Sequence, residues 1–130
     1  MRISSDLMGQ LIAHARGEAP NECCGIIGLV DGAAARFYPA RNRFESPMRF
    51  EVHPDDLHRI YLETSERGEE IALFHSHPRS EAYPSQTDVN LASWWPGSPW
   101  LIASLADSEP VVRGFQIDGS DVREFELDVG

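Results

Sequence analysis

Apolar residues recur at helical spacing in three segments of the chain. Every third or fourth residue of "SDLMGQLIAHAR" is apolar, which predicts an amphipathic helix over residues 5–16, with a serine at its start as the cap. A second helix is predicted over residues 53–68, "HPDDLHRIYLETSERG", which has a proline near its start and a glycine at its end. The stretch "SQTDVNLASWW", residues 85–95, predicts a third and shorter helix.

Short apolar runs between turn residues predict the strands of a sheet. "CCGIIGLV" is followed by Asp31 and Gly32, a dipeptide typical of hairpins, and then by "ARFYPA". Further strands are predicted in "MRFEV", "IALFHSH", "WLIASLAD", "VVRGFQID" and "REFELDV". Helices and strands in this order predict an α/β or α+β fold around a mixed sheet, as a single domain over residues 1–130.

Composition limits the partners and the cellular compartment that we expect for the chain. Its net charge is −10, and all eleven basic residues are arginine. Such an acidic chain repels phosphate backbones, so nucleic acid is not expected as a partner. No apolar run approaches the ~20 residues of a membrane span, and the first residues lack the apolar core of a secretory signal. We therefore expect a cytoplasmic protein without a membrane partner, and the adjacent Cys23 and Cys24 fit a reducing compartment.

Two histidines end the predicted strand "IALFHSH". Because side chains alternate on a strand, His75 and His77 point to the same face, with their Cα atoms ~6.6 Å apart. Asp88 follows eleven residues after His77, far enough for a loop to bring its carboxylate back to the pair. Two imidazoles and one carboxylate form a good set of zinc ligands that leaves a fourth position for a catalytic water.

These residues also have simpler interpretations. A His-x-His pair at a strand end is often a surface pair, and Ser85 and Asp88 have the spacing of a helix capping box. Glu22, beside a proline and an asparagine, is by itself most easily a solvated carboxylate. Local sequence leaves the structural and the functional interpretations open.

The whole pattern resembles one family. His75-Ser76-His77, seven residues, Ser85, two residues and Asp88 is similar to the signature of the JAMM metalloproteases, also called MPN-plus domains. That family also carries an upstream Glu-x-Cys-Gly, which stands here as "ECCG" from Glu22 to Gly25. The resemblance covers residues 1–105 and implies the MPN/JAMM (cytidine deaminase-like) fold, a mixed curved sheet flanked by helices.

The resemblance also implies a role for each motif residue. His75, His77 and Asp88 correspond to the ligands of one zinc ion, which a water completes. Glu22 corresponds to the general base that takes a proton from this water and passes it to the leaving amine. Ser85 corresponds to the donor that hydrogen-bonds the oxyanion. No residue of the set is missing, which argues against the inactive relatives of the family, although other divalent ions could also occupy such ligands.

The family further implies a substrate class. Its members hydrolyse the amide bond after the C-terminal Gly-Gly tail of ubiquitin or a ubiquitin-like protein. The chain is short and lacks long insertions, so it resembles the stand-alone prokaryotic branch, and "SEAYPSQTDV" looks closest to enzymes that release cysteine from a sulfur carrier protein. The sequence does not decide whether the leaving group is cysteine or a lysine. It also leaves the oligomeric state open, and a homodimer is one possibility.

Two alternatives belong to other classes of protein. A non-catalytic interaction module could use the same fold, with zinc structural or absent. A cupin could use His75, His77 and Glu81 as metal ligands, but a cupin is nearly all strand. The three tryptophans of "SWWPGSPW" fit core packing, whereas an exposed tryptophan there would indicate an interface.

Overall fold

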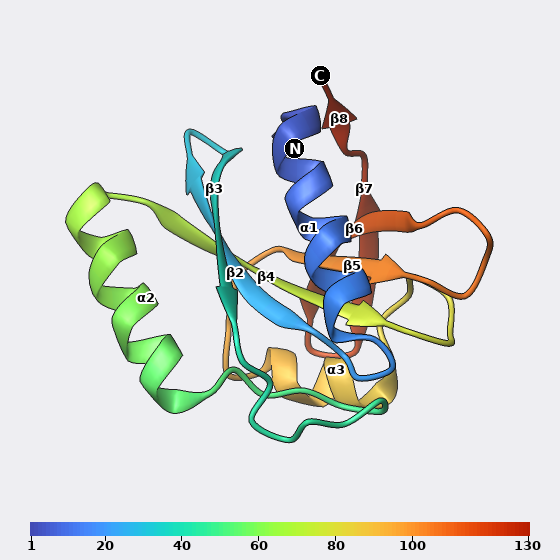
Figure 1. Ribbon diagram of the computed structural model, residues 1–130. Coiled ribbons are helices and arrows are strands. Elements are labelled where there is room, and N and C mark those ends of the chain that lie inside the picture. Colours follow the sequence, from blue (N-terminus) through green and yellow to red (C-terminus); the bar gives the residue numbers. More distant parts are fainter.

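A mixed six-stranded sheet forms the centre of the computed structural model, which describes residues 1–130 (Figure 1). The elements in chain order are β1 (Arg2–Ile3), α1 (Ser5–Glu18), β2 (Cys24–Val30), β3 (Ala33–Ala40), α2 (Pro54–Arg67), β4 (Glu70–His77), α3 (Gln86–Ala92), β5 (Trp100–Ser104), β6 (Val111–Asp118), β7 (Asp121–Phe125) and β8 (Asp128–Val129). No helix is both long and apolar enough to cross a membrane.

The strands lie in the order β3-β2-β4-β5-β6-β7. All neighbours are antiparallel except β4 and β5, which run parallel and are connected through α3. The short strands β1 and β8 form a separate parallel pair close to the two chain ends. The predicted mixed sheet flanked by helices is therefore confirmed.

Residues at the helix ends explain where α1 and α2 begin and end. The Ser4 side chain accepts a hydrogen bond from the Leu7 amide and so caps α1, as the serine at this position predicts. Pro54 occupies the first turn of α2, where no backbone donor is required. Gly68 ends α2 in the left-handed conformation (φ +69°), which glycine adopts without steric cost.

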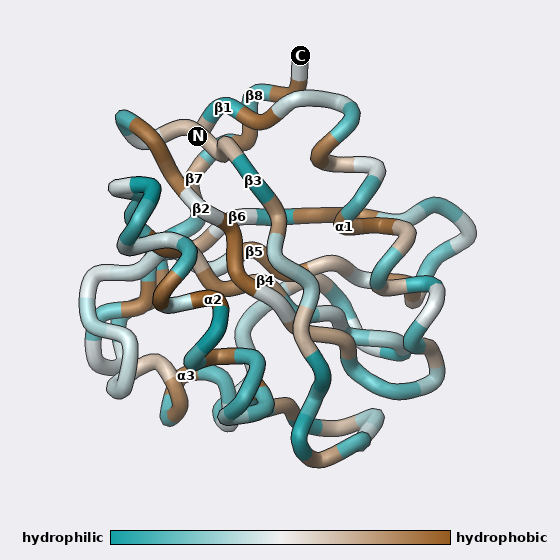
Figure 2. The backbone as a smooth tube through the Cα atoms, turned by 60° about the vertical axis from the view of Figure 1, so that its left-hand side comes forward, coloured by the Kyte–Doolittle hydropathy of each residue, from teal (hydrophilic) through white to brown (hydrophobic).

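The sheet has an apolar cluster on each face, and Figure 2 shows the hydrophobic residues concentrated along its central strands. One cluster packs under α1 and includes Ala72 and Phe74 of β4. The other packs against α2 and α3 and includes Leu73 of the same strand. By this alternation the side chains of His75 and His77 belong to the α2/α3 face, and Ser76 belongs to the α1 face.

One predicted strand and two predicted element boundaries are wrong. The stretch "MRFEV", residues 48–52, is not a strand of the sheet, and only Val52 makes an isolated bridge, to Asn42. The third helix ends at Ala92 rather than continuing through the tryptophans. The predicted last strand is divided into β7 and β8, because residues 126 and 127 between them leave the ladder.

Gly25 on β2 offers a test of how closely β2 and β3 pack. A Cβ atom at this position would lie 2.5 Å from Phe37 Cε1 and 2.7 Å from the Tyr38 carbonyl oxygen. We expect Gly25→Ala to lower the free energy of unfolding by about 1–3 kcal/mol in urea titrations. Gly9→Ala is the matched control, because nothing lies within 4 Å of its Cβ and α1 should gain up to about 1 kcal/mol. Equal stability of Gly25→Ala and the wild type would contradict the packing described here.

Candidate metal centre

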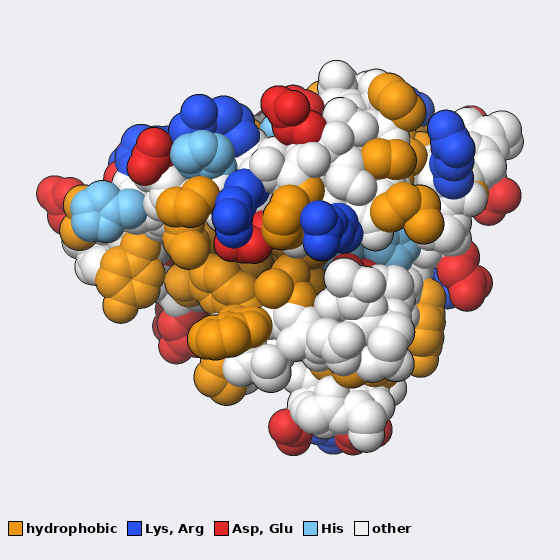
Figure 3. Space-filling view, turned by 90° about the horizontal axis from the view of Figure 1, so that it is seen from below, with side chains coloured by type: hydrophobic (Ala, Val, Ile, Leu, Met, Phe, Trp, Pro, Cys, Tyr) orange, Lys and Arg blue, Asp and Glu red, His pale blue; other side chains and the backbone are white.

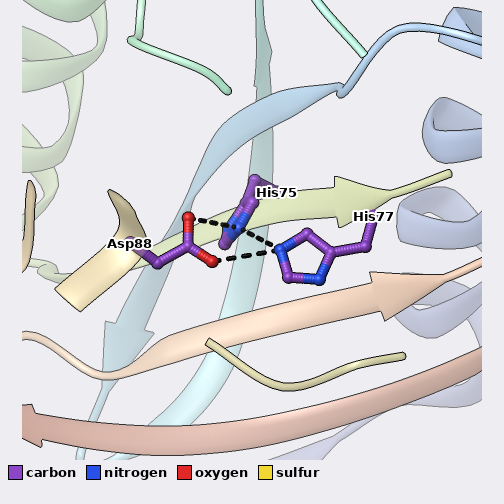
Figure 4. Close-up of side chains that lie close together, drawn as sticks. All are labelled: His75, His77 and Asp88. Carbon is purple, nitrogen blue, oxygen red and sulfur yellow. Dashed lines mark hydrogen bonds and ion pairs between the residues drawn. The ribbon is translucent and has the colours of Figure 1, made fainter. Parts of the chain in front are cut away.

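Three buried side chains from β4 and α3 converge on one point (Figure 4). His75 Nε2 lies 3.0 Å from Asp88 Oδ1, and His77 Nε2 lies 3.0 Å from Asp88 Oδ2. The two Nε2 atoms are 3.1 Å apart. The structure thus brings together the three residues that the sequence predicts as ligands.

These distances fit one tetrahedral cation. Atoms at ~2.0–2.1 Å from a tetrahedral Zn²⁺ are ~3.3 Å from one another, close to the separations between His75, His77 and Asp88. When both rings carry their protons on Nδ1, the two Nε2 atoms offer their lone pairs to a cation between them. The donor set, two nitrogens and one carboxylate, suits zinc and leaves a position free for water.

The surroundings of the histidines fix the direction of their rings. His77 Nδ1 lies 2.8 Å from the Glu81 carbonyl oxygen and donates to it, so Nε2 is left as the free lone pair. His75 Nδ1 has no hydrogen-bond partner among protein atoms, and this ring is held by packing, with the Phe50 ring stacked on it at 4.3 Å. Complete burial lowers the pKa of His75, which favours the neutral imidazole that a metal requires.

Asp88 is positioned by the first turn of α3. Its Oδ2 accepts a hydrogen bond from the Ser85 amide, and its own amide donates to Ser85 Oγ, which completes a capping box. Burial acts to raise the pKa of Asp88, but His75, His77 and the Ser85 amide outweigh it and hold this pKa well below the usual range. The Ser85 hydroxyl only accepts here, so its own proton remains free to donate to a ligand.

Glu22 lies beside the cluster, just before β2. Strands β2 and β4 are antiparallel, with Cys24 opposite His75. The pairing continues beyond Cys24, because the Ser76 amide donates to the Cys23 carbonyl. Two residues further along, Glu22 therefore lies opposite His77. The side chain is buried and its Oε1 has no hydrogen-bond partner. Burial raises the pKa of Glu22 to about 8, against a lowering effect of His77. The solvated-surface interpretation of Glu22 is wrong, because the side chain is buried.

Sequence reasoning missed three residues that hold Glu22 and its neighbour Cys23 in place. The Ser76 hydroxyl, on the α1 face of β4, accepts a hydrogen bond of 2.8 Å from the Cys23 amide. Asn42 Nδ2 donates to the Glu22 carbonyl at 3.1 Å, and the Glu22 amide donates to the Ser46 carbonyl. These bonds join residues 20 to 53 positions apart, and no local sequence pattern reports them.

Apolar side chains gather on the face that carries α2, α3 and the loop 41–53 (Figure 3). Trp100 is fully buried as core, whereas Trp94 is 78% exposed, so the three tryptophans do not share one role. A cavity of about 570 Å³ on this face is lined by Phe50, Val52, Leu57, Leu91, Trp94 and Trp95, among others. The exposed Trp94 therefore has the surroundings of an interface residue rather than of core.

Comparisons with known proteins identify the family of the chain. The family described as prokaryotic homologues of the JAB domain matches residues 4–118. A CysO-cysteine peptidase of Mycobacterium tuberculosis is 31% identical over 127 residues, which cover 94% of this chain and 86% of the relative. A desampylase of Haloferax volcanii is 30% identical over 112 residues, or 80% of each chain.

A solved structure of a related protein has the same fold. The solution structure of a Desulfitobacterium hafniense protein superimposes with a TM-score of 0.88 at 32% identity, over 99% of this chain and 92% of the other. The cupin alternative is therefore wrong, because three helices and a mixed open sheet replace its barrel. The chain belongs to the prokaryotic JAB (JAMM/MPN) family.

Proposed function

We propose that this protein is a zinc metallopeptidase that hydrolyses the amide bond after the C-terminal Gly-Gly of a ubiquitin-like protein, and that it releases cysteine from a sulfur carrier adduct. The observation that carries the proposal is the convergence of His75, His77 and Asp88 beside the buried, unpaired carboxyl of Glu22. The relatives support the substrate class, since one is a CysO-cysteine peptidase and another a desampylase.

Each residue has a separate task in this proposal. His75, His77 and Asp88 would hold the zinc ion, which supplies a water of lowered pKa and polarises the scissile carbonyl when it is bound. Glu22 accepts a proton from the attacking water and then gives it to the leaving nitrogen. Ser85 donates a hydrogen bond from its free hydroxyl to the carbonyl oxygen as negative charge develops there.

The direct test uses the protein with one equivalent of zinc. The substrates are a carrier protein that ends in Gly-Gly-Cys and the same carrier joined through Gly-Gly to a lysine side chain. Intact-mass spectrometry should show the carrier ending in Gly-Gly after incubation with zinc-loaded protein, and not after incubation with chelator-treated protein. If neither conjugate is cleaved, the protein is better described as a non-catalytic interaction module.

Ser85 offers a way to separate capping from catalysis. Ser85→Ala should lower kcat by about 10²–10³-fold, as the loss of an oxyanion donor does, and also lower stability by about 1 kcal/mol through the lost cap. Ser85→Gly is the matched variant, because glycine at this cap position costs only about a few tenths of a kcal/mol and has no side-chain donor. We expect Ser85→Gly to unfold at nearly the wild-type temperature while its kcat stays low. Recovery of kcat together with stability would show that Ser85 acts only as a cap.

A further inference from the structure

The position of Glu22 indicates where the leaving group must lie. In the proposed function, on which this inference rests, Glu22 gives its proton to the leaving nitrogen, so this nitrogen comes within hydrogen-bond distance of the carboxyl. The atoms that follow the nitrogen must then occupy the space next to Glu22. The structure has a cavity of about 420 Å³ there, lined by Glu18, Asn21, Glu22, Arg41, Asn42, Arg43, Glu45 and His53.

The lining of this cavity selects against one class of leaving group. None of its residues is hydrophobic, in contrast to the apolar cavity beside Trp94. A lysine joined through its side chain would place four methylene groups directly after the nitrogen, where no apolar surface could cover them. An amino acid joined through its α-nitrogen instead carries a carboxylate only ~2.5 Å beyond this nitrogen.

Arg43 has the donors to bind such a carboxylate. Its Nη1 pairs with Glu51 at 3.1 and 3.2 Å, while its Nε and Nη2 make no hydrogen bond. These free atoms form the planar edge that binds a carboxylate through two parallel bonds. Arg41 lies on the same wall and is held by Asp56 through Nε and Nη2, which leaves Nη1 free. The second arginine adds positive charge at a fixed position.

We propose that this cavity is a subsite for a leaving group with a free α-carboxylate, and that Arg43, supported by Arg41, recognises it. The protein would then remove a single C-terminal amino acid after Gly-Gly in preference to a lysine-linked or carboxamide-blocked one. The reaction consumes one water: the C–N bond breaks, the glycine carbon gains the oxygen as a carboxylate, and the nitrogen leaves as an ammonium. The released amino acid is a zwitterion, which fits a wall that also carries Glu18 and Glu45.

The test compares two substrates that differ in one group. A carrier ending in Gly-Gly-Cys with a free carboxylate is compared with the same carrier ending in the cysteine carboxamide, and kcat/KM is measured for each. The zinc-loaded wild type should prefer the carboxylate by about tenfold or more, as expected for a charged hydrogen bond. Arg43→Gln should collapse this ratio towards one, mainly through KM for the carboxylate substrate.

Arg123 provides the control. Its side chain is 70% exposed and pairs with Asp121 on β7, and neither residue lines this cavity. Arg123→Gln should therefore keep the wild-type ratio. Equal cleavage of both substrates by the wild type, or an unchanged ratio in Arg43→Gln, would overturn the inference while the proposed function stands. Cleavage of neither substrate by the wild type would overturn both.

Discussion

Glu22→Gln should lose peptidase activity by about 10²–10⁴-fold while its zinc content stays at the wild-type value. The amide has the shape of the carboxyl but cannot accept and return a proton. Glu22 is buried opposite His77 with Oε1 unpaired, so the replacement removes no hydrogen bond of that atom. Activity is measured by intact mass of the Gly-Gly conjugate, and zinc by atomic emission on the same sample.

The control for this substitution is Glu66→Gln, an exposed position on α2 that should keep full activity. Two results would contradict the assigned role. Full activity of Glu22→Gln would exclude Glu22 as the base. Loss of zinc together with activity would make Glu22 a ligand instead of a proton carrier.

Asp88→Ala should abolish both zinc binding and cleavage. The substitution removes one of three ligands. Zinc affinity should therefore fall by more than the ~10–100-fold lost when a residue that only hydrogen-bonds to a ligand is replaced. The variant also leaves the Ser85 amide without its acceptor, which should destabilise the start of α3 by about 1 kcal/mol. Zinc affinity is measured by competition with a chelating dye, and folding by circular dichroism and thermal unfolding.

Glu81→Ala is the matched control for Asp88→Ala. Glu81 orients His77 through its backbone carbonyl, which the substitution keeps, and its side chain is exposed. This variant should bind zinc and cleave as the wild type does. A folded Asp88→Ala protein that binds zinc with unchanged affinity would refute the proposed ligand set.

Periodicity predicted the elements that position the site. The alternation in "IALFHSH" placed His75 and His77 on one face of a strand, and the structure has them there, on β4. The spacing of Ser85 and Asp88 predicted both a capping box and a ligand, and the structure forms the capping box with Asp88 turned towards the histidines. These features depend on contacts close in sequence or on a regular strand, which is why the sequence reports them.

The segment 48–52 shows where periodicity fails. Phe50 and Val52 are buried, as the alternation indicates, but the segment is bonded to the loop in front of it and not to the sheet. A hydrophobic pattern reports which side chains are buried, whereas the partner of the backbone depends on distant residues. The same limit applies to Ser76 and Asn42, whose partners lie far along the chain.

Asn42 ties the loop 41–53 to Glu22, the proposed proton carrier. Its side chain makes four hydrogen bonds, to the Glu22 carbonyl, the Arg49 carbonyl, and the amides of Phe44 and Glu51. Three of these bonds lie within the loop and hold its shape, whereas the fourth ties the loop to Glu22, so the loop and Glu22 should move as one unit. A conjugate that holds the loop closed would then hold Glu22 in its working position for longer. Tighter binding of the carrier and faster cleavage would therefore occur together.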